Sequence, residues 1–156
     1  MPEALAAELS EAELTAWGER IGREAGTPLV IALRGDLGAG KSTLARGIVH
    51  GAGVEGDVPS PTFNLLFRYD TPRGVTVHHL DLYRLEDPAE VWELGWAELG
   101  AAGDVVLIEW PERAETMLPE TRWEVVLEET GDGARRRVEA TPVGEPPALP
   151  VPGAAR

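Results

Sequence analysis

A glycine-rich stretch that ends in lysine and serine is the first candidate for chemistry. Residues 35–42, Gly-Asp-Leu-Gly-Ala-Gly-Lys-Ser, match the pattern G-x-x-x-x-G-K-[ST] at each fixed position. Glycines let backbone N–H groups turn inward around phosphate oxygens, and the N-terminus of a following helix adds free donors and a positive dipole end. Lys41, the only lysine of the chain, would neutralise the phosphates, and the Ser42 hydroxyl would bind Mg²⁺. The stretch predicts a site for nucleotide phosphates.

Two acidic residues in apolar runs are candidates for completing a magnesium site. Mg²⁺ on a nucleotide is usually held by the loop hydroxyl and by an acid at the end of a neighbouring buried strand. Glu109 ends the run VVLIE, which is the expected setting, and Asp81 lies inside HHLDLYRL. Asp81 could reach the metal through water or orient the attacking water. Because a buried acid is costly unless paired, salt bridges to Arg84 or Arg113 are the structural alternative.

Two further residues are open to a functional and a structural interpretation. Thr62, in the loop sequence SPTF, could sense a γ-phosphate and order its loop, or serve in a plain turn. Trp110 directly follows Glu109 at the carboxyl end of a predicted strand, where ligands collect in open sheets. It could stack on a base or simply pack.

The elements that must position these residues predict an α/β domain. Residues 29–35 form a nearly continuous apolar run, typical of a strand buried in a parallel sheet, and a helix is expected over 41–50. Ser10 and Glu13 have the spacing of a capping box at the start of an N-terminal helix. The other expected elements are strands at 64–70, 75–85 and 104–112, a helix from Asp87, and a hairpin at 122–140. We therefore expect a three-layer P-loop NTPase fold, with a mostly parallel central sheet and an antiparallel hairpin at its edge.

Composition limits the domain organisation and the surroundings of the protein. The 156 residues suffice for one domain, which we place at 1–140; residues 141–156 contain five prolines without a core pattern and predict a disordered tail. The absence of cysteine excludes disulfides and thiolate sites. No window is apolar enough to span a membrane, and the acidic N-terminus is unlike a signal peptide, so we expect a cytoplasmic protein. The net charge of −13 opposes any independent grip on a nucleic-acid backbone.

Four blocks in this order and spacing, GDLGAGKST, SPTF, HHLDLYRL and LIEWPE, resemble the bacterial TsaE family, formerly called YjeE. The resemblance covers about Leu9 to Ala140. It implies a small ATPase, with ATP and Mg²⁺ as its cofactors, required for making threonylcarbamoyladenosine in tRNAs that read ANN codons. It also implies docking on the TsaD–TsaB pair, with tRNA reached only through these partners and no membrane involved.

The resemblance also implies roles for individual residues. Residues wrapping the ATP phosphates would be Asp36, Leu37, Gly38, Ala39, Gly40, Lys41, Ser42 and Thr43. Thr62 would be the switch residue, Asp81 a carboxylate needed for hydrolysis, Glu109 the second magnesium ligand and Trp110 an aromatic beside the nucleotide. Thr15 would border the adenine pocket. Ser42 stands where the family more often has threonine, which preserves the hydroxyl, and Asn64 also replaces a common threonine.

Three other functions share parts of this pattern. A P-loop kinase for a small metabolite would use the same loop and metal, but such kinases bring lid arginines over the transferred phosphate, and the arginines here are scattered. A GTPase needs an N-K-x-D motif, and the only asparagine is Asn64. A nucleotide-gated binding module, in which ATP orders the SPTF loop and hydrolysis is incidental, overlaps with the main hypothesis.

Overall fold

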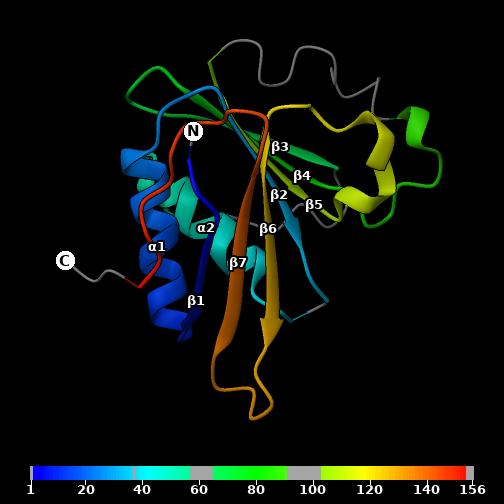
Figure 1. Cartoon of the computed structure of the whole chain (residues 1–156). Coiled ribbons are helices and arrows are strands. Elements are labelled where there is room, and N and C mark those ends of the chain that lie inside the picture. Colours follow the sequence, from blue (N-terminus) through cyan, green and yellow to red (C-terminus); the bar gives the residue numbers. More distant parts are fainter. Residues whose placement is uncertain (1, 37, 57–64, 91–102, 154–156) are drawn as a thin grey trace.

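The computed structural model describes residues 2–36, 38–56, 65–90 and 103–153. Within them, seven strands form one sheet in the order β1-β7-β6-β2-β5-β4-β3 (Figure 1). The strands are β1 Leu5–Leu9, β2 Leu29–Arg34, β3 Leu66–Asp70, β4 Thr76–Asp81, β5 Val105–Glu109, β6 Arg122–Glu129 and β7 Arg136–Val143. The helical elements are α1 Glu11–Glu24, α2 Lys41–Gly51 and the 3-10 segment η3 Pro111–Met117.

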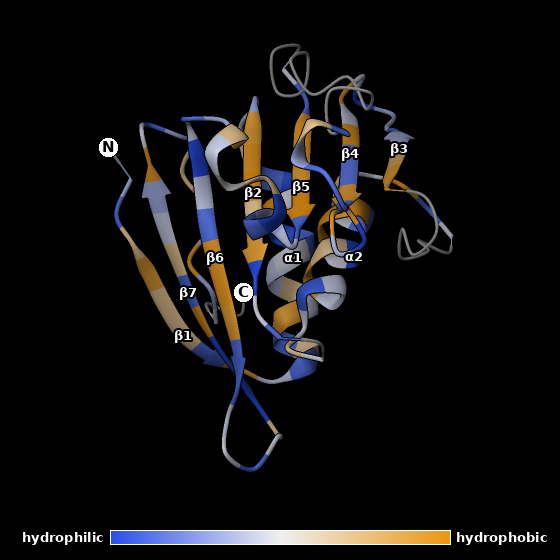
Figure 2. Ribbon diagram, turned by 90° about the vertical axis from the view of Figure 1, so that its right-hand side faces the viewer, coloured by the Kyte–Doolittle hydropathy of each residue, from blue (hydrophilic) through white to orange (hydrophobic). Residues whose placement is uncertain are grey.

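The four central strands of the sheet are parallel. β2 pairs with β6 on one side and with β5 on the other, and β5 pairs with β4. Apart from Arg34 and Glu109 at their carboxyl ends, β2 and β5 are apolar, as is typical of strands buried on both faces (Figure 2). The strand and the helix predicted on either side of the glycine-rich stretch are confirmed as β2 and α2.

The outer part of the sheet differs from the prediction. The hairpin β6–β7 is confirmed, but it does not form the edge, because β1 pairs antiparallel with β7 and lies outside it. The sequence LAAEL of β1 carries too weak an alternation to predict a strand. At the other edge, β3 pairs antiparallel with β4.

Helices α1 and α2 lie against the same face of the sheet, and their contact is made by glycines (Figure 1). Gly18 and Gly22 of α1 face Gly47 and Gly51 of α2, so the backbones approach closely. A Cβ at Gly22 would overlap the carbonyl oxygen of Ile48. The capping box at Ser10 and Glu13 that predicted α1 is present. None of the helices in the described ranges is long and apolar enough to cross a membrane.

η3 lies on the opposite face of the sheet (Figure 1, yellow). Its Ala114, and Leu118 directly after it, belong to the same apolar cluster as Val106 and Ile108 of β5. The helix expected from Asp87 begins with a turn, since Glu90 N donates to Asp87 O. Its continuation falls in 91–102, outside the described residues. The helix itself therefore stays a prediction.

The C-terminal segment that we expected to be disordered packs on the domain. β7 continues to Val143, so the boundary placed at residue 140 falls inside a strand. Residues 144–153, here called the strap, then run along α1 (Figure 1, red). Trp123 Nε1 donates to Pro147 O and Trp17 Nε1 to Pro150 O, both at 2.8 Å, while Leu149 joins the core and is 7% exposed. Prolines cannot donate backbone hydrogen bonds, but their carbonyls accept from these two indoles, which explains how such a segment is held.

Candidate functional site

The glycine-rich loop, residues 35–40, lies where parallel strands reach their carboxyl ends. It follows β2, and α2 begins at Lys41 with Gly40 as its N-cap residue. Gly40 has φ 105°, a backbone conformation that residues with a Cβ rarely adopt, so the conformation of this position favours glycine. A glycine cap has no side chain to occupy the N–H groups of the first helical turn, which leaves these donors for an anion.

A cavity of about 400 Å³ opens beside this loop. Its lining includes eight residues predicted for the site: Gly38, Gly40, Lys41, Ser42, Thr43, Asp81, Glu109 and Trp110. Asp36 and Ala39 instead line a neighbouring depression beside the end of β6. Thr15 does not line the cavity, whereas Glu11 and Leu14 of the same helix do. Leu37 and Thr62 lie outside the described residues.

Lys41 is held at the base of the cavity. It is only 4% exposed, its Nζ donates to Gly35 O at 2.5 Å, and Nζ lies 3.4 Å from the centroid of the Trp110 ring. Burial lowers the pKa of Lys41, and the negative charges of Glu109 and other nearby acids oppose this shift. The ammonium thus sits over an aromatic face in a partly dehydrated place, where attraction to a phosphate is stronger than in water.

Glu109 links the loop to the neighbouring strand. The carboxylate is 2% exposed; its Oε1 accepts from Ser42 Oγ at 3.1 Å, and its Oε2 lies 2.6 Å from His79 Nε2. These contacts, rather than a salt bridge to arginine, are the partners that the structure gives to this buried acid. Glu109 and Ser42 are therefore adjacent, as the magnesium hypothesis requires.

Asp81 lies next to Glu109 because the two residues are register partners at the ends of β4 and β5. Its Oδ1 accepts from Tyr83 N at 3.0 Å. Burial raises the pKa of Asp81, and the charge of Glu109 adds to this rise, while the N–H of Tyr83 opposes it. An acid with a raised pKa beside a cavity is a functional candidate.

The oxygen donors present suit Mg²⁺ better than a softer metal. Ser42, Glu109 and Asp81 offer hydroxyl and carboxylate oxygens at one end of the cavity. Across the described part of the chain, no cluster of three or more His, Cys, Asp or Glu side chains is arranged to hold a metal ion. Mg²⁺ is commonly bound through one or two protein groups together with nucleotide phosphates and water, so the few donors here are sufficient.

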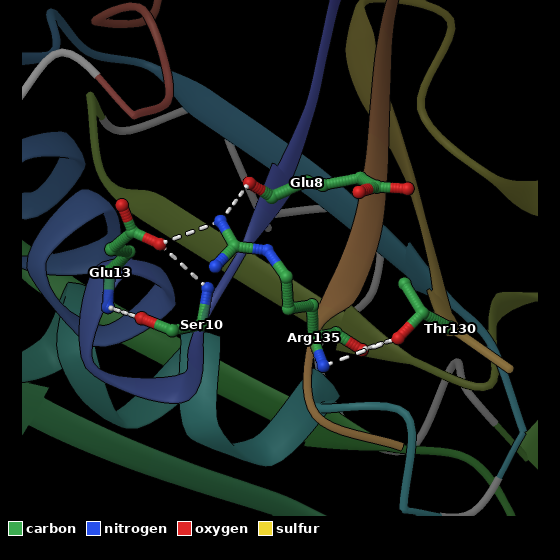
Figure 3. Close-up of polar contacts among 5 residues, drawn as sticks. All are labelled: Glu8, Ser10, Glu13, Thr130 and Arg135. Atoms are coloured by element: carbon green, nitrogen blue, oxygen red, sulfur yellow. Dashed lines mark hydrogen bonds and ion pairs between the residues drawn. The ribbon is translucent and has the colours of Figure 1, made fainter. Parts of the chain in front are cut away.

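Another wall of the cavity comes from the start of α1 and from the β6–β7 hairpin, which contribute Glu11, Leu14 and Arg136. Arg135 ties these elements together, because its guanidinium donates to Glu8 O at 2.9 Å and to Glu13 Oε1 at 3.0 Å (Figure 3). Glu13 Oε1 also accepts from Ser10 N at 2.8 Å, as the capping box requires. This exposed network adds little stability but fixes the start of α1 against the hairpin.

Several residues of the site were not predicted from the sequence, and His79 is the most informative of them. The period of two along β4 places His79 on the same face as Asp81, a signal that was available in HHLD. Tyr83 was also missed; its ring centroid lies 4.9 Å from that of Trp110. Arg136 gave no local signal, because it reaches the cavity through hairpin pairing.

Comparisons with known proteins relate the chain to one family. The family model of "Threonylcarbamoyl adenosine biosynthesis protein TsaE" matches residues 9–138. A TsaE protein of Haemophilus influenzae is 44% identical over 92 residues, 59% of this chain and 58% of that relative's length. The TsaE protein of Bacillus subtilis is 40% identical over 116 residues, 74% of this chain and 70% of its own.

A solved structure matches the fold as well. The crystal structure of YdiB from Bacillus subtilis superposes with a TM-score of 0.76 at 30% identity, covering 92% of this chain and 88% of that one. The family match spans most of the residues that build the sheet, the loop and the cavity. The chain belongs to the TsaE family of threonylcarbamoyl adenosine biosynthesis proteins.

Proposed function

We propose that this protein binds ATP with Mg²⁺ in the cavity beside the glycine-rich loop and hydrolyses it. The observation that carries the proposal is the convergence of Lys41, Ser42 and Glu109 around one cavity at the end of a parallel sheet. The fold would be that of a P-loop NTPase. Residues 36–43 would surround the phosphates, with Asp36, Leu37 and Ala39 contributing through their backbone and Thr43 in the first turn of α2.

Each side chain of the site has a definite task in this proposal. Lys41 would exchange its contact with Gly35 O for phosphate oxygens and take up charge that develops during hydrolysis. Ser42 and Glu109 would hold the metal, which, when bound, supplies Lewis-acid neutralisation of the phosphate oxygens. Asp81 would orient the attacking water, and Thr62 would report the γ-phosphate to its loop.

The nucleoside end of the ligand would lie toward the aromatic and hairpin walls. Trp110 lines the cavity next to Lys41 and offers a ring face to the nucleotide. Glu11 and Leu14 line the cavity from the helix that carries Thr15: Leu14 directly precedes Thr15, and Glu11 lies about one turn before it. We assign the adenine border to this end of α1 rather than to Thr15 alone.

The purpose of hydrolysis would be to reset the TsaD–TsaB pair during threonylcarbamoyladenosine formation on tRNAs that read ANN codons. Membership of the TsaE family supports this role. The net charge of −13 supports an indirect relation to tRNA, because 27 acidic residues against 14 basic ones repel the phosphate backbone. The reaction would take place in the cytoplasm.

The proposal is tested by measuring phosphate release from Mg·ATP with the protein alone and with TsaD and TsaB of the same organism. Lys41→Ala is the control, since it removes the phosphate cation and leaves the partner surfaces. We expect slow release alone, strong stimulation by the pair and loss of both in the variant. Turnover that ignores the partners would contradict coupling and reopen the kinase hypothesis, while turnover unchanged in Lys41→Ala would refute the site.

A further inference from the structure

His79 is a fully buried histidine whose ring touches the site without lining its cavity. It is 0% exposed, and its Nε2 lies 2.6 Å from Glu109 Oε2. When the carboxylate of Glu109 is ionised it can only accept hydrogen bonds, and Nε2 is then the donor in this contact. The other ring nitrogen, Nδ1, is enclosed and has no hydrogen-bond partner among the described residues. The Nδ1 of His78 is enclosed and unpaired in the same way, so the feature specific to His79 is the contact of its Nε2 with Glu109.

The position of His79 follows from the sheet. β4 and β5 are parallel, with Asp81 opposite Glu109 and His79 opposite Leu107, two residues deeper in the sheet. The Glu109 carboxylate therefore lies between the His79 ring and the Ser42 hydroxyl. Its two oxygens have different partners: Oε2 meets His79 and Oε1 meets Ser42.

We propose that His79 is a positioning residue that holds Glu109 Oε2, so that Oε1 stays turned toward Ser42 and toward the metal of a bound Mg·nucleotide. This inference rests on the proposed function of the same cavity. A carboxylate on a single-bonded side chain can rotate, and a donor fixed on a rigid strand prevents that rotation at one of the two oxygens. Outer-shell hydrogen bonds of this kind typically contribute about 10- to 100-fold to metal affinity or activity.

The neighbouring histidine provides a matched control. His78 points to the other face of β4, is 9% exposed and hydrogen-bonds Asp104 at 3.0 Å. It is almost as buried as His79 and has a carboxylate partner, but it has no contact with Glu109. Loss of His78 should lower stability without changing any property of the metal site.

The experiment measures the affinity for ADP by calorimetry over a series of Mg²⁺ concentrations and in EDTA. The variants are His79→Leu, which removes the donor, His79→Gln, which places an amide donor near the position of Nε2, and the control His78→Leu. We expect His79→Leu to keep the ADP affinity measured in EDTA, and to need about 10- to 100-fold more Mg²⁺ than wild type for the same gain in affinity. His79→Gln should recover most of this loss, and His78→Leu should have the Mg²⁺ response of the wild type.

A double variant tests whether His79 acts through Glu109. If it does, adding His79→Leu to Glu109→Gln should cause no further loss of Mg²⁺-dependent ADP affinity, because the carboxylate that His79 positions is already replaced. Additive losses would overturn the proposal, as would a wild-type Mg²⁺ response in His79→Leu. If the wild-type affinity for ADP does not depend on Mg²⁺, the proposed function itself fails, which is a different result.

The proposal stays testable even if His79→Leu does not fold. In wild-type protein labelled with ¹⁵N, the Nε2–H of His79 should be protected from exchange, and its resonance should shift when Mg·ADP replaces metal-free ADP. The resonances of His78 should not respond to that exchange. A His79 resonance that ignores the metal would overturn the proposal.

Discussion

Replacing Leu149 by alanine should destabilise the whole domain, although this residue belongs to a proline-rich segment near the end of the chain. Leu149 is 7% exposed and packs in the core cluster that also contains Trp17 and Trp123. Buried leucine-to-alanine changes cost about 2–5 kcal/mol of unfolding free energy, and a site at the rim of the core belongs in the lower half of that range. We therefore expect a loss of about 2–3 kcal/mol, a large share of a total of about 5–15 kcal/mol.

The assay is thermal unfolding followed by circular dichroism. For a chain of this size, a loss of about 2–3 kcal/mol corresponds to a drop in Tm of about 4–12 °C. Val151→Ala is the matched control: it lies two residues further along the strap but is 56% exposed, so its effect should stay within about 0.5 kcal/mol. If both variants melt like the wild type, the strap does not contribute to the core, and the packing argument is refuted.

Three more substitutions test other parts of the structure. Asp81→Asn should impair ATP hydrolysis but raise the Tm near pH 7, because the raised pKa of Asp81 means that its ionised form is disfavoured in the folded state. The gain in Tm should vanish in acid, where Asp81 is protonated, and a variant less stable than wild type near pH 7 would contradict this reasoning. Glu124→Gln should lower stability near pH 7, because the pKa of Glu124 is lowered in the folded state: burial acts to raise this pKa, but hydrogen bonds from two arginines outweigh burial. The difference from wild type should close as the pH falls through and below the unfolded pKa of about 4.3, so denaturant titrations at several pH values should converge in acid. Gly22→Ala should lower the free energy of unfolding by about 1–3 kcal/mol or more, since the added Cβ would overlap Ile48 O. Gly131→Ala is the control in the same denaturant unfolding, because a Cβ at Gly131 meets no atom within 4 Å; equal effects of the two substitutions would refute the close helix contact.

The central part of the fold could be predicted because its signals are local. The apolar run of β2, the loop glycines and the capping box before α1 each specify their own structure. β1 could not be predicted, because a five-residue strand with two alanines becomes a strand only by pairing with β7, far along the chain. The strap was missed for a similar reason: its proline carbonyls are satisfied by two tryptophans that the composition does not connect to it.

In the candidate site too, residues in local sequence patterns could be predicted, and residues that depend on strand pairing could not. Lys41, Ser42 and Glu109 belong to recognisable local patterns, and the structure brings them to one cavity. The strand assignment also contained His79, but only the parallel register of β4 and β5 shows that its ring reaches Glu109. Arg136 depends on the hairpin and could not have been placed from its neighbours in the sequence.

The glycine contact between α1 and α2 determines how ligand binding at the loop would affect parts of the molecule far from the cavity. Because two backbones in direct contact cannot slide without breaking main-chain packing, the helices should open to solvent as one cooperative unit. α2 carries the phosphate-facing residues at its start, whereas most of α1 lies away from the cavity. Occupancy of the loop should therefore slow amide hydrogen exchange throughout α1, including turns that no ligand could reach.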